Sequence, residues 1–185
     1  MGYVVYDAKD MKAEEFFAEH PELSEQSDRK LLTDVLFKAL ANEDIPSRAV
    51  LAEKLLAWGA DVTAVHEERV NVVHVFASRV KDPALEAPLL RRLLEAGADP
   101  NLQSGRYGTP LEEFMYKPRL DEDDLAPVYD VWFAHPGLDF SMVDRNGRDL
   151  LDKVRRVRGS SPKLVERVER YIVEHGGVLP PNPYV

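Results

Sequence analysis

The chain has 185 residues, a usual length for one domain with a single hydrophobic core. It contains no cysteine, which excludes disulfides and thiolate metal sites. Its net charge is −9, from 24 lysines and arginines against 33 aspartates and glutamates, and a surface of this sign repels nucleic-acid phosphates. The first twenty residues are charged throughout and lack a signal peptide's apolar stretch, and no segment approaches the length of a membrane span. We therefore expect a cytoplasmic protein that binds neither nucleic acid nor membrane.

A short phrase recurs along the chain at a nearly constant spacing. Its copies are LLAWGADVT ending at Thr63, LLEAGADPN ending at Asn101, WFAHPGLDFS ending at Ser141 and YIVEHGGVL ending at Leu179. Their glycines are Gly59, Gly97, Gly137 and Gly176. These glycines are separated by 38, 40 and 39 residues, a period typical of repeat proteins. Each is expected to adopt the left-handed conformation that closes a helix.

A second phrase, seen most clearly as Gly-Thr-Pro-Leu at residues 108–111, keeps the same period. Its polar residue is predicted to cap a helix, because such side chains accept hydrogen bonds from the first N–H groups. The predicted caps are Asp34, Asn71, Thr109 and Asp149. Pro110 and Glu112 after Thr109 indicate a capping box.

A second helix in each unit is predicted to begin near the next proline. The prolines concerned are Pro46, followed by Ser47, then Pro88, Pro127 and Pro162. Each unit is therefore predicted to consist of a helix, a loop, a second helix and a turn-rich link. Pro180, Pro181 and Pro183 are expected to end the array.

In alternation, the two phrases resemble the signature of the ankyrin-repeat family over residues 30 to 178, most strongly at Gly97–Asn101 and Gly108–Leu111. The resemblance implies an all-α helical repeat solenoid with about four helix-pair repeats, an N-terminal capping helix and short finger links. The expected parts of this single domain, 1–185, are a cap at 10–29, repeats at 30–66, 67–104, 105–144 and 145–179, and a tail at 180–185. Residues 10 to 20 are predicted to form a lone outer helix, since FFAEHP echoes FAHP at 133–136.

The chain departs from the family in repeat length, since its repeats run 37 to 40 residues against about 33. Phe76 and Phe114 also stand where the family has small alanines. Both features predict a wider helix spacing in a divergent member.

Motifs for catalysis or metal binding do not assemble. His66-Glu67 begins like H-E-x-x-H, but Val70 stands where the second histidine is needed. The acidic run at 121–124 lacks the calcium-loop pattern and is expected to precede an outer helix in solvent. The remaining candidates are expected to have structural roles. Three histidines belong to turns (His20, His135 and His175), and four aromatic residues are packing residues (Trp58, Trp132, Phe16 and Phe17). His74 is expected to make the family's structural hydrogen bond. We expect no catalytic residue, cofactor or metal, and no enzyme activity.

The resemblance also implies a partner-binding concave face, formed by finger tips and the exposed side of the inner helices. The residues it places there are Glu67, Glu68, Ser78, Arg79, Arg106, Tyr107, Tyr116, Lys117, Arg145, Asn146, Arg148 and Arg156. This strip is mostly basic, and arginine and tyrosine are favoured at binding hot spots. Two interpretations stay open: the strip binds an acidic patch, or its arginines pair with Asp144, Asp149 or Asp152 and are solvated.

Small, acidic, cysteine-free chains of this kind resemble bacterial immunity proteins, which neutralise a cognate toxin by direct binding. We therefore expect a monomeric module with one protein partner, acting as an inhibitor or immunity protein. The alternative is a general adaptor or effector that recruits a cellular protein through weaker contacts. An enzyme or small-ligand binder needs a pocket with converging titratable groups, and the sequence offers no such set.

Overall fold

The computed structural model of the protein describes residues 2–115, 120–144, 146–156 and 162–184. Within these ranges the fold is all-α, as predicted, with two isolated β-bridges and no strand. The elements are α1 (Gly2–Asp10), α2 (Ala13–Glu19), α3 (Arg29–Ala39), α4 (Ile45–Ala57), the 3-10 turn η1 (Glu67–Arg69), α5 (Val72–Arg79), α6 (Pro83–Glu95), α7 (Pro110–Met115), α8 (Glu122–Phe133), α9 (Leu150–Arg156) and α10 (Pro162–Glu174). None of these helices has the length and apolar character of a membrane span.

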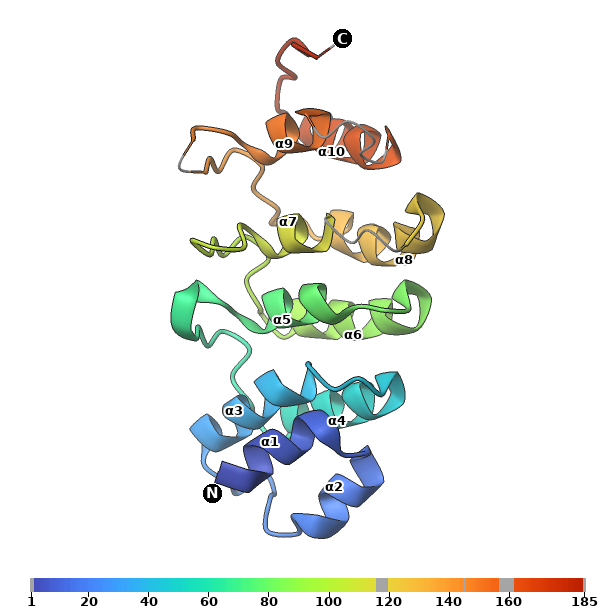
Figure 1. The fold of residues 1–185 in the computed structure, drawn as a ribbon. Helices are drawn as coiled ribbons and strands as arrows, with labels where there is room; N and C mark the ends of the chain where they lie inside the picture. The colour runs from blue at the N-terminus through green and yellow to red at the C-terminus, as the bar shows by residue number, and fades with distance from the viewer. Residues whose placement is uncertain (1, 116–119, 145, 157–161, 185) are drawn as a thin grey trace.

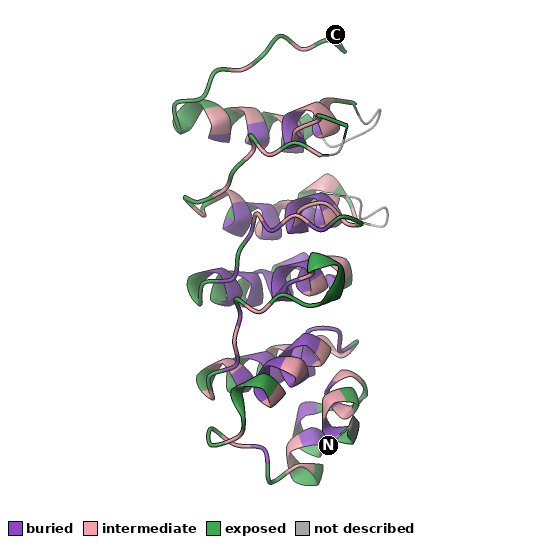
Figure 2. Cartoon of the chain, turned by 90° about the vertical axis from the view of Figure 1, so that its left-hand side faces the viewer, coloured by how far each residue is buried: buried purple, intermediate pink, exposed green. Residues whose placement is uncertain are grey.

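The helices stack in layers of two from the N-terminus to the C-terminus (Figure 1). One row contains α1, α3, α5 and α7, which pack on one another in that order. The other row contains α2, α4, α6, α8 and α10, again packed in order, and α9 pairs with α10. Figure 2 shows that burial is concentrated along the helices, while the links facing the viewer are mostly exposed or half-buried.

Three of the predicted helix caps are present. The side chain of Asn71 accepts from the His74 N–H at 3.1 Å, at the start of α5. Thr109 Oγ1 accepts from the Glu112 N–H at 3.3 Å, and Asp149 Oδ1 accepts from the Asp152 N–H at 2.8 Å. These bonds begin the inner helices α5, α7 and α9 at the predicted places.

The fourth predicted cap, Asp34, is wrong. The N-cap of α3 is Asp28, whose side chain accepts from the Leu31 N–H at 3.2 Å. Asp34 lies inside the helix, where Lys30 Nζ donates to it at 2.8 Å. An acidic residue six positions earlier offers the same capping chemistry and starts the helix sooner.

The outer helices also begin at acidic caps that precede the predicted prolines. Asp44 caps α4 and Asp82 caps α6, each accepting from the N–H three residues on. Pro88 and Pro127 therefore lie inside α6 and α8, beyond the helix starts that they were expected to mark. Pro162 does begin α10, as predicted.

The GAD phrase folds into one local turn in three layers. Asp61, Asp99 and Asp139 each accept with Oδ1 from the N–H two residues on, at 2.9, 2.8 and 2.9 Å. Of the glycines before these turns, Gly59 and Gly97 are left-handed, with φ of 95° and 99°. Gly137 does not share this conformation, and its N–H instead donates to His135 Nδ1 at 3.1 Å. The left-handed expectation is therefore wrong at Gly137, which follows a proline, whereas Gly59 follows a tryptophan and Gly97 an alanine.

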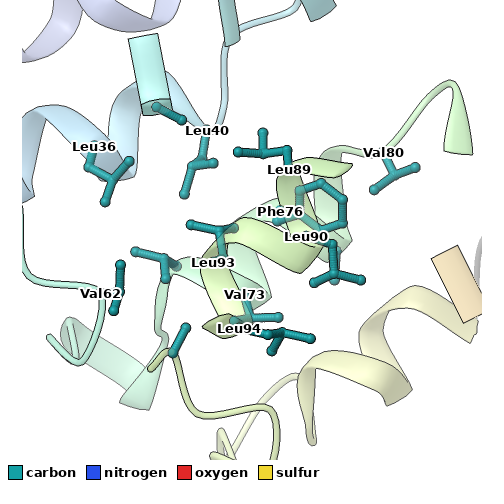
Figure 3. Close-up of a cluster of buried hydrophobic side chains, with 14 of the residues drawn as sticks. Leu36, Leu40, Val62, Val73, Phe76, Val80, Leu89, Leu90, Leu93 and Leu94 are labelled. Carbon is teal, nitrogen blue, oxygen red and sulfur yellow. The ribbon is translucent and has the colours of Figure 1, made fainter. Parts of the chain in front are cut away.

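Apolar side chains fill the space between layers and form a continuous core. Figure 3 shows Phe76 beside Leu89 and Leu90, with Val80 and Leu93 around them. The two phenylalanines that replace small residues, Phe76 and Phe114, are both fully buried. Among the outer-helix aromatics, Phe16 and Trp132 are buried as well, and the Phe17 ring meets that of Trp58 edge-on at 5.8 Å. These four aromatics are packing residues, as predicted.

The N-terminal end contains a helix that the sequence analysis missed. The predicted lone helix at residues 10–20 corresponds to α2, but α1 precedes it and packs on α3. The Asn42 amide holds the last turn of α1 and the start of the α1–α2 link, donating to the Ala8 and Met11 carbonyls at 3.0 and 2.8 Å. The chain therefore starts with a pair of helices that covers both rows of the stack.

Candidate protein-binding surface

Three hairpin-like links project from the same side of the stack, away from the helix pairs (Figure 1). We call them finger 1 (residues 66–70), finger 2 (104–108) and finger 3 (144–148, of which residue 145 lies outside the described part). Each is closed by backbone pairing: His66 N–H to Val70 at 2.8 Å, Ser104 N–H to Gly108 at 2.8 Å, and Asp144 N–H to Arg148 at 2.9 Å.

The tip of finger 1 has an uncommon backbone. Glu68 and Arg69 are both left-handed, with φ of 59° and 58°, which costs about 1–2 kcal/mol for each non-glycine residue. Finger 2 holds this tip in place. Ser104 Oγ donates to the Glu68 carbonyl at 2.8 Å, and Arg69 Nε donates to the Gln103 carbonyl at 3.2 Å. Two hydrogen bonds from a neighbouring segment therefore hold the tip in this conformation.

Further side chains connect successive layers. His74 Nε2 donates to the Gly108 carbonyl at 3.0 Å, which is the structural hydrogen bond expected of this histidine. Burial lowers the pKa of His74, and the bond to Gly108 opposes that shift only in part, so the ring is neutral at pH 7. Asn101 spans the next gap, donating to the Gly137 carbonyl at 2.6 Å and accepting from the Asp139 N–H at 2.9 Å.

A first hollow of about 910 Å³, which we call the N-terminal hollow, lies where finger 1, α3 and α5 meet. Its floor includes the Phe37 ring, which stacks on the His66 imidazole at 3.6 Å. Its charged lining is mixed, with Lys9, Lys30, Lys38 and Arg79 facing Asp34, Glu67, Glu68 and Glu113. This hollow therefore carries no excess of one sign among its described lining residues.

A second hollow of about 890 Å³, the C-terminal hollow, lies between fingers 2 and 3. Its described lining contains five cationic side chains, which are Arg69, Arg106, Arg148, Lys153 and Arg156. It contains three carboxylates, which are Asp99, Glu112 and Asp144. The excess is positive, opposite in sign to the net charge of the chain.

The carboxylates of the C-terminal hollow are committed to bonds within the chain. Lys153 Nζ reaches Glu112 at 2.8 Å and Asp144 at 3.6 Å, and the Lys153 and Glu112 side chains are only 11% and 8% exposed. Asp144 also accepts from the backbone N–H groups of Asn146 and Arg148, at 2.7 and 3.1 Å. Desolvation raises its pKa, but these N–H groups, with Lys153 and Arg148, outweigh it and lower the pKa of Asp144 to about 2.

The arginines of the C-terminal hollow are less fully committed to bonds within the chain. Arg106 is 68% exposed, lies 3.7 Å from Glu68 and holds its guanidinium 5.2 Å from the centre of the Tyr107 ring. Arg148 pairs with Asp144 at 3.4 Å, yet its buried Nε has no hydrogen-bond partner among the described residues. Arg156 is exposed, and no described carboxylate lies within ion-pairing distance of it.

The structure brings the described members of the predicted strip together around two adjacent hollows. The N-terminal hollow is lined by Glu67, Glu68, Ser78, Arg79 and Tyr107, and the C-terminal hollow by Arg106, Tyr107, Asn146, Arg148 and Arg156. Tyr107 lines both. The other predicted members, Tyr116, Lys117 and Arg145, lie outside the described residues.

Of the two interpretations of the strip, the one in which its arginines are paired and solvated is met by Arg148 and not by Arg156. Arg148 pairs with Asp144, as the solvated interpretation expects. Asp149 instead caps α9, and Arg156 makes no described pair with any of these carboxylates.

Some lining residues were not found from the sequence. Phe37 and Lys153 lie on inner helices, and each is placed by a partner distant in the chain, His66 or Glu112. Arg69 differs, because its place beside Glu67 and Glu68 in the finger was a usable signal. In the described part of the chain, histidine and acidic side chains nowhere gather in a group that could hold a metal ion.

No protein-family model and no curated protein matches the chain. Its fold is similar to the crystal structure of a functionally unknown protein from Leptotrichia buccalis C-1013-b. The two share 22% sequence identity and a TM-score of 0.75, over 95% of this chain and 96% of that one. At this identity the similarity concerns the fold alone.

Proposed function

We propose that the chain is a divergent ankyrin-type repeat solenoid that binds another protein through its three fingers and the adjoining inner helices. The repeat assignment is supported by the recurring Asp turn of the GAD phrase and by caps at equivalent places in successive layers. Stacked units of this kind bury a continuous core and leave one side free for a partner.

The observation that carries the binding role is the set of exposed side chains on fingers held rigid by the fold. Glu67, Glu68, Arg106 and Asn146 are exposed in the fingers, while Ser104 ties finger 2 to finger 1 and Asn101 ties the turn before finger 2 to the next layer. Charged and aromatic groups on a preorganised surface suit protein recognition. We further propose that the partner is an enzyme or toxin and that this chain is its inhibitor or immunity protein.

The titratable groups favour this role over catalysis. The three aspartates with lowered pKa values, Asp44, Asp61 and Asp144, each accept from backbone N–H groups of their own cap or turn. Such shifts belong to structural carboxylates, whereas an acid or base catalyst needs a pKa moved toward neutrality. We therefore propose binding without a chemical step.

The test is capture of a partner by tagged protein in cells of its source, identified by mass spectrometry. A single stoichiometric partner that Tyr107→Ala loses and Tyr184→Ala retains would support the proposal, because Tyr107 lines both hollows and the half-exposed Tyr184 lies in the tail. Protection of cells from that partner's toxicity would establish the immunity role. Several substoichiometric partners would favour an adaptor, and equal capture by both variants would refute the assigned surface.

A further inference from the structure

The C-terminal hollow combines positive charge with hydrogen-bond donors that the chain itself does not use. All three carboxylates of its described lining accept from donors within the chain. Asp99 accepts from the Asn101 N–H, Glu112 from the Lys153 ammonium, and Asp144 from the Asn146 N–H of its own finger. Among the described residues, Asp99 and Glu112 therefore pair with none of the arginines, and Asp144 pairs with Arg148 alone.

Four guanidinium groups line the described part of the hollow, and three of them are candidate ligand-binding groups. Arg106 and Arg156 are exposed, and Arg148 has a buried Nε without a partner among the described residues. Guanidinium groups bind carboxylates through two parallel hydrogen bonds, and such charge-assisted bonds are stronger than neutral ones. Tyr107 adds an aromatic wall beside Arg106.

The two hollows differ in what they can recognise. Cationic and acidic side chains balance in the N-terminal hollow, so it offers no preference for a charged ligand. The C-terminal hollow has five cations against three carboxylates in a chain of net charge −9. A long polyanion such as nucleic acid is repelled by the rest of that surface, whereas a short acidic segment need only meet the hollow itself.

We propose that the C-terminal hollow is the binding site for an acidic loop of the partner protein, whose aspartate or glutamate side chains pair with Arg106, Arg148 and Arg156. This inference rests on the proposed function and adds the chemistry of the partner to it. The partner's loop enters between fingers 2 and 3, and its carboxylates take the donors that Asp144 and Glu112 leave unused.

The experiment uses the full chain and a fluorescent synthetic peptide of alternating glycine and glutamate, with a glutamine version as the neutral probe. Binding is followed by fluorescence anisotropy at low and at moderate salt. The test variant is Arg106→Glu with Arg156→Glu. The matched control is Arg91→Glu with Arg170→Glu, which changes the net charge equally on exposed sites of the outer helices α6 and α10. Circular dichroism confirms that both variants are folded.

The proposal expects the acidic peptide to bind, the neutral peptide not to bind, and added salt to weaken binding. The test variant should bind at least about tenfold more weakly, as expected on loss of bonds to a charged group, and the control within about twofold of the original chain. Equal losses in both variants would overturn the proposal, because binding would then follow net charge alone. So would absence of binding up to about 1 mM peptide.

Two further arms separate this inference from the proposed function and from other ligands. If the test variant still captures the stoichiometric partner of the original chain, the proposal that the C-terminal hollow binds an acidic loop is wrong, and the proposed protein-binding function stands. If the original chain captures no partner, the proposed function itself fails. A single-stranded oligonucleotide of the same net charge should bind less tightly than the peptide, and tighter binding would make the hollow a general polyanion site, against the proposal.

Discussion

Replacing Glu86 by glutamine should destabilise the protein by about 3–5 kcal/mol, because it leaves a buried guanidinium without its counter-charge. Glu86 pairs with Arg48, and their side chains are 1% and 0% exposed. Arg48 also donates to the carbonyls of Asn42 and Arg79, at 2.8 and 3.1 Å, so it joins the α3–α4 link to the end of α5. Desolvation lowers the pKa of Arg48, and the Glu86 carboxylate offsets that effect only in part.

The glutamine variant isolates the charge because it preserves shape. Its amide oxygen can still accept from the Lys81 and Asp82 N–H groups, which donate to Glu86 at 2.8 and 2.9 Å. What is lost is the counter-charge of a cation that stays protonated in any folded protein. For a chain of this length the loss corresponds to a fall of about 10 °C in the melting temperature.

The measurement is urea unfolding followed by circular dichroism, with thermal melts alongside. The matched control is Glu53→Gln, which breaks the Arg92–Glu53 pair between the neighbouring outer helices α4 and α6. Those side chains are 44% and 53% exposed, so this loss should stay below about 1 kcal/mol. Adding Arg48→Met to Glu86→Gln should restore part of the stability, since the uncompensated charge is gone. If Glu86→Gln costs no more than the control, the reasoning from burial is refuted.

Three other predictions follow from single side chains. Burial lowers the pKa of His74, so on acidification the unfolded state takes up a proton before the folded state does. The free energy of unfolding should therefore fall as the pH drops below about 6.5. His74→Gln should reduce this pH dependence in urea titrations. The pKa of Asp144 is lowered to about 2, so its carboxylate stabilises the folded state above pH 3.8 and this stabilisation is lost on acidification. The difference in melting temperature between the original chain and Asp144→Asn should therefore narrow from pH 4 to pH 2. Asn71→Ala should cost about 2 kcal/mol in chemical unfolding, because it removes the α5 cap and the 2.7 Å bond to the Asp99 carbonyl; a loss of a few tenths would show that water replaces both bonds.

The candidate surface was predictable only where its residues belong to the repeated phrases. Arg106 and Tyr107 lie two and one residues before the glycine of Gly-Thr-Pro-Leu, so their place in a finger could be read from the spacing. Lys153 had no such signal, because its role in the C-terminal hollow depends on Glu112, 41 residues away. Nor did the sequence indicate that the strip divides into a hollow of balanced charge and one of positive charge.

Features set by nearby residues were determined by the sequence itself. The Asp61 and Asp99 turns and the Asn71 cap are bonds between a side chain and backbone two or three residues on, so local chemistry suffices to form them. Even these local rules compete, as the choice of Asp28 over Asp34 at the start of α3 shows.

Only the tertiary structure decided which layers meet and what their contacts require. The buried Arg48–Glu86 pair joins residues 38 apart, and the left-handed tip of finger 1 is held by Ser104, 36 residues from Glu68. α1 has no copy of the repeated phrases, and its place is set by packing on α3. Such contacts form only after stacking has brought distant segments together, and their strength depends on the water that stacking excludes.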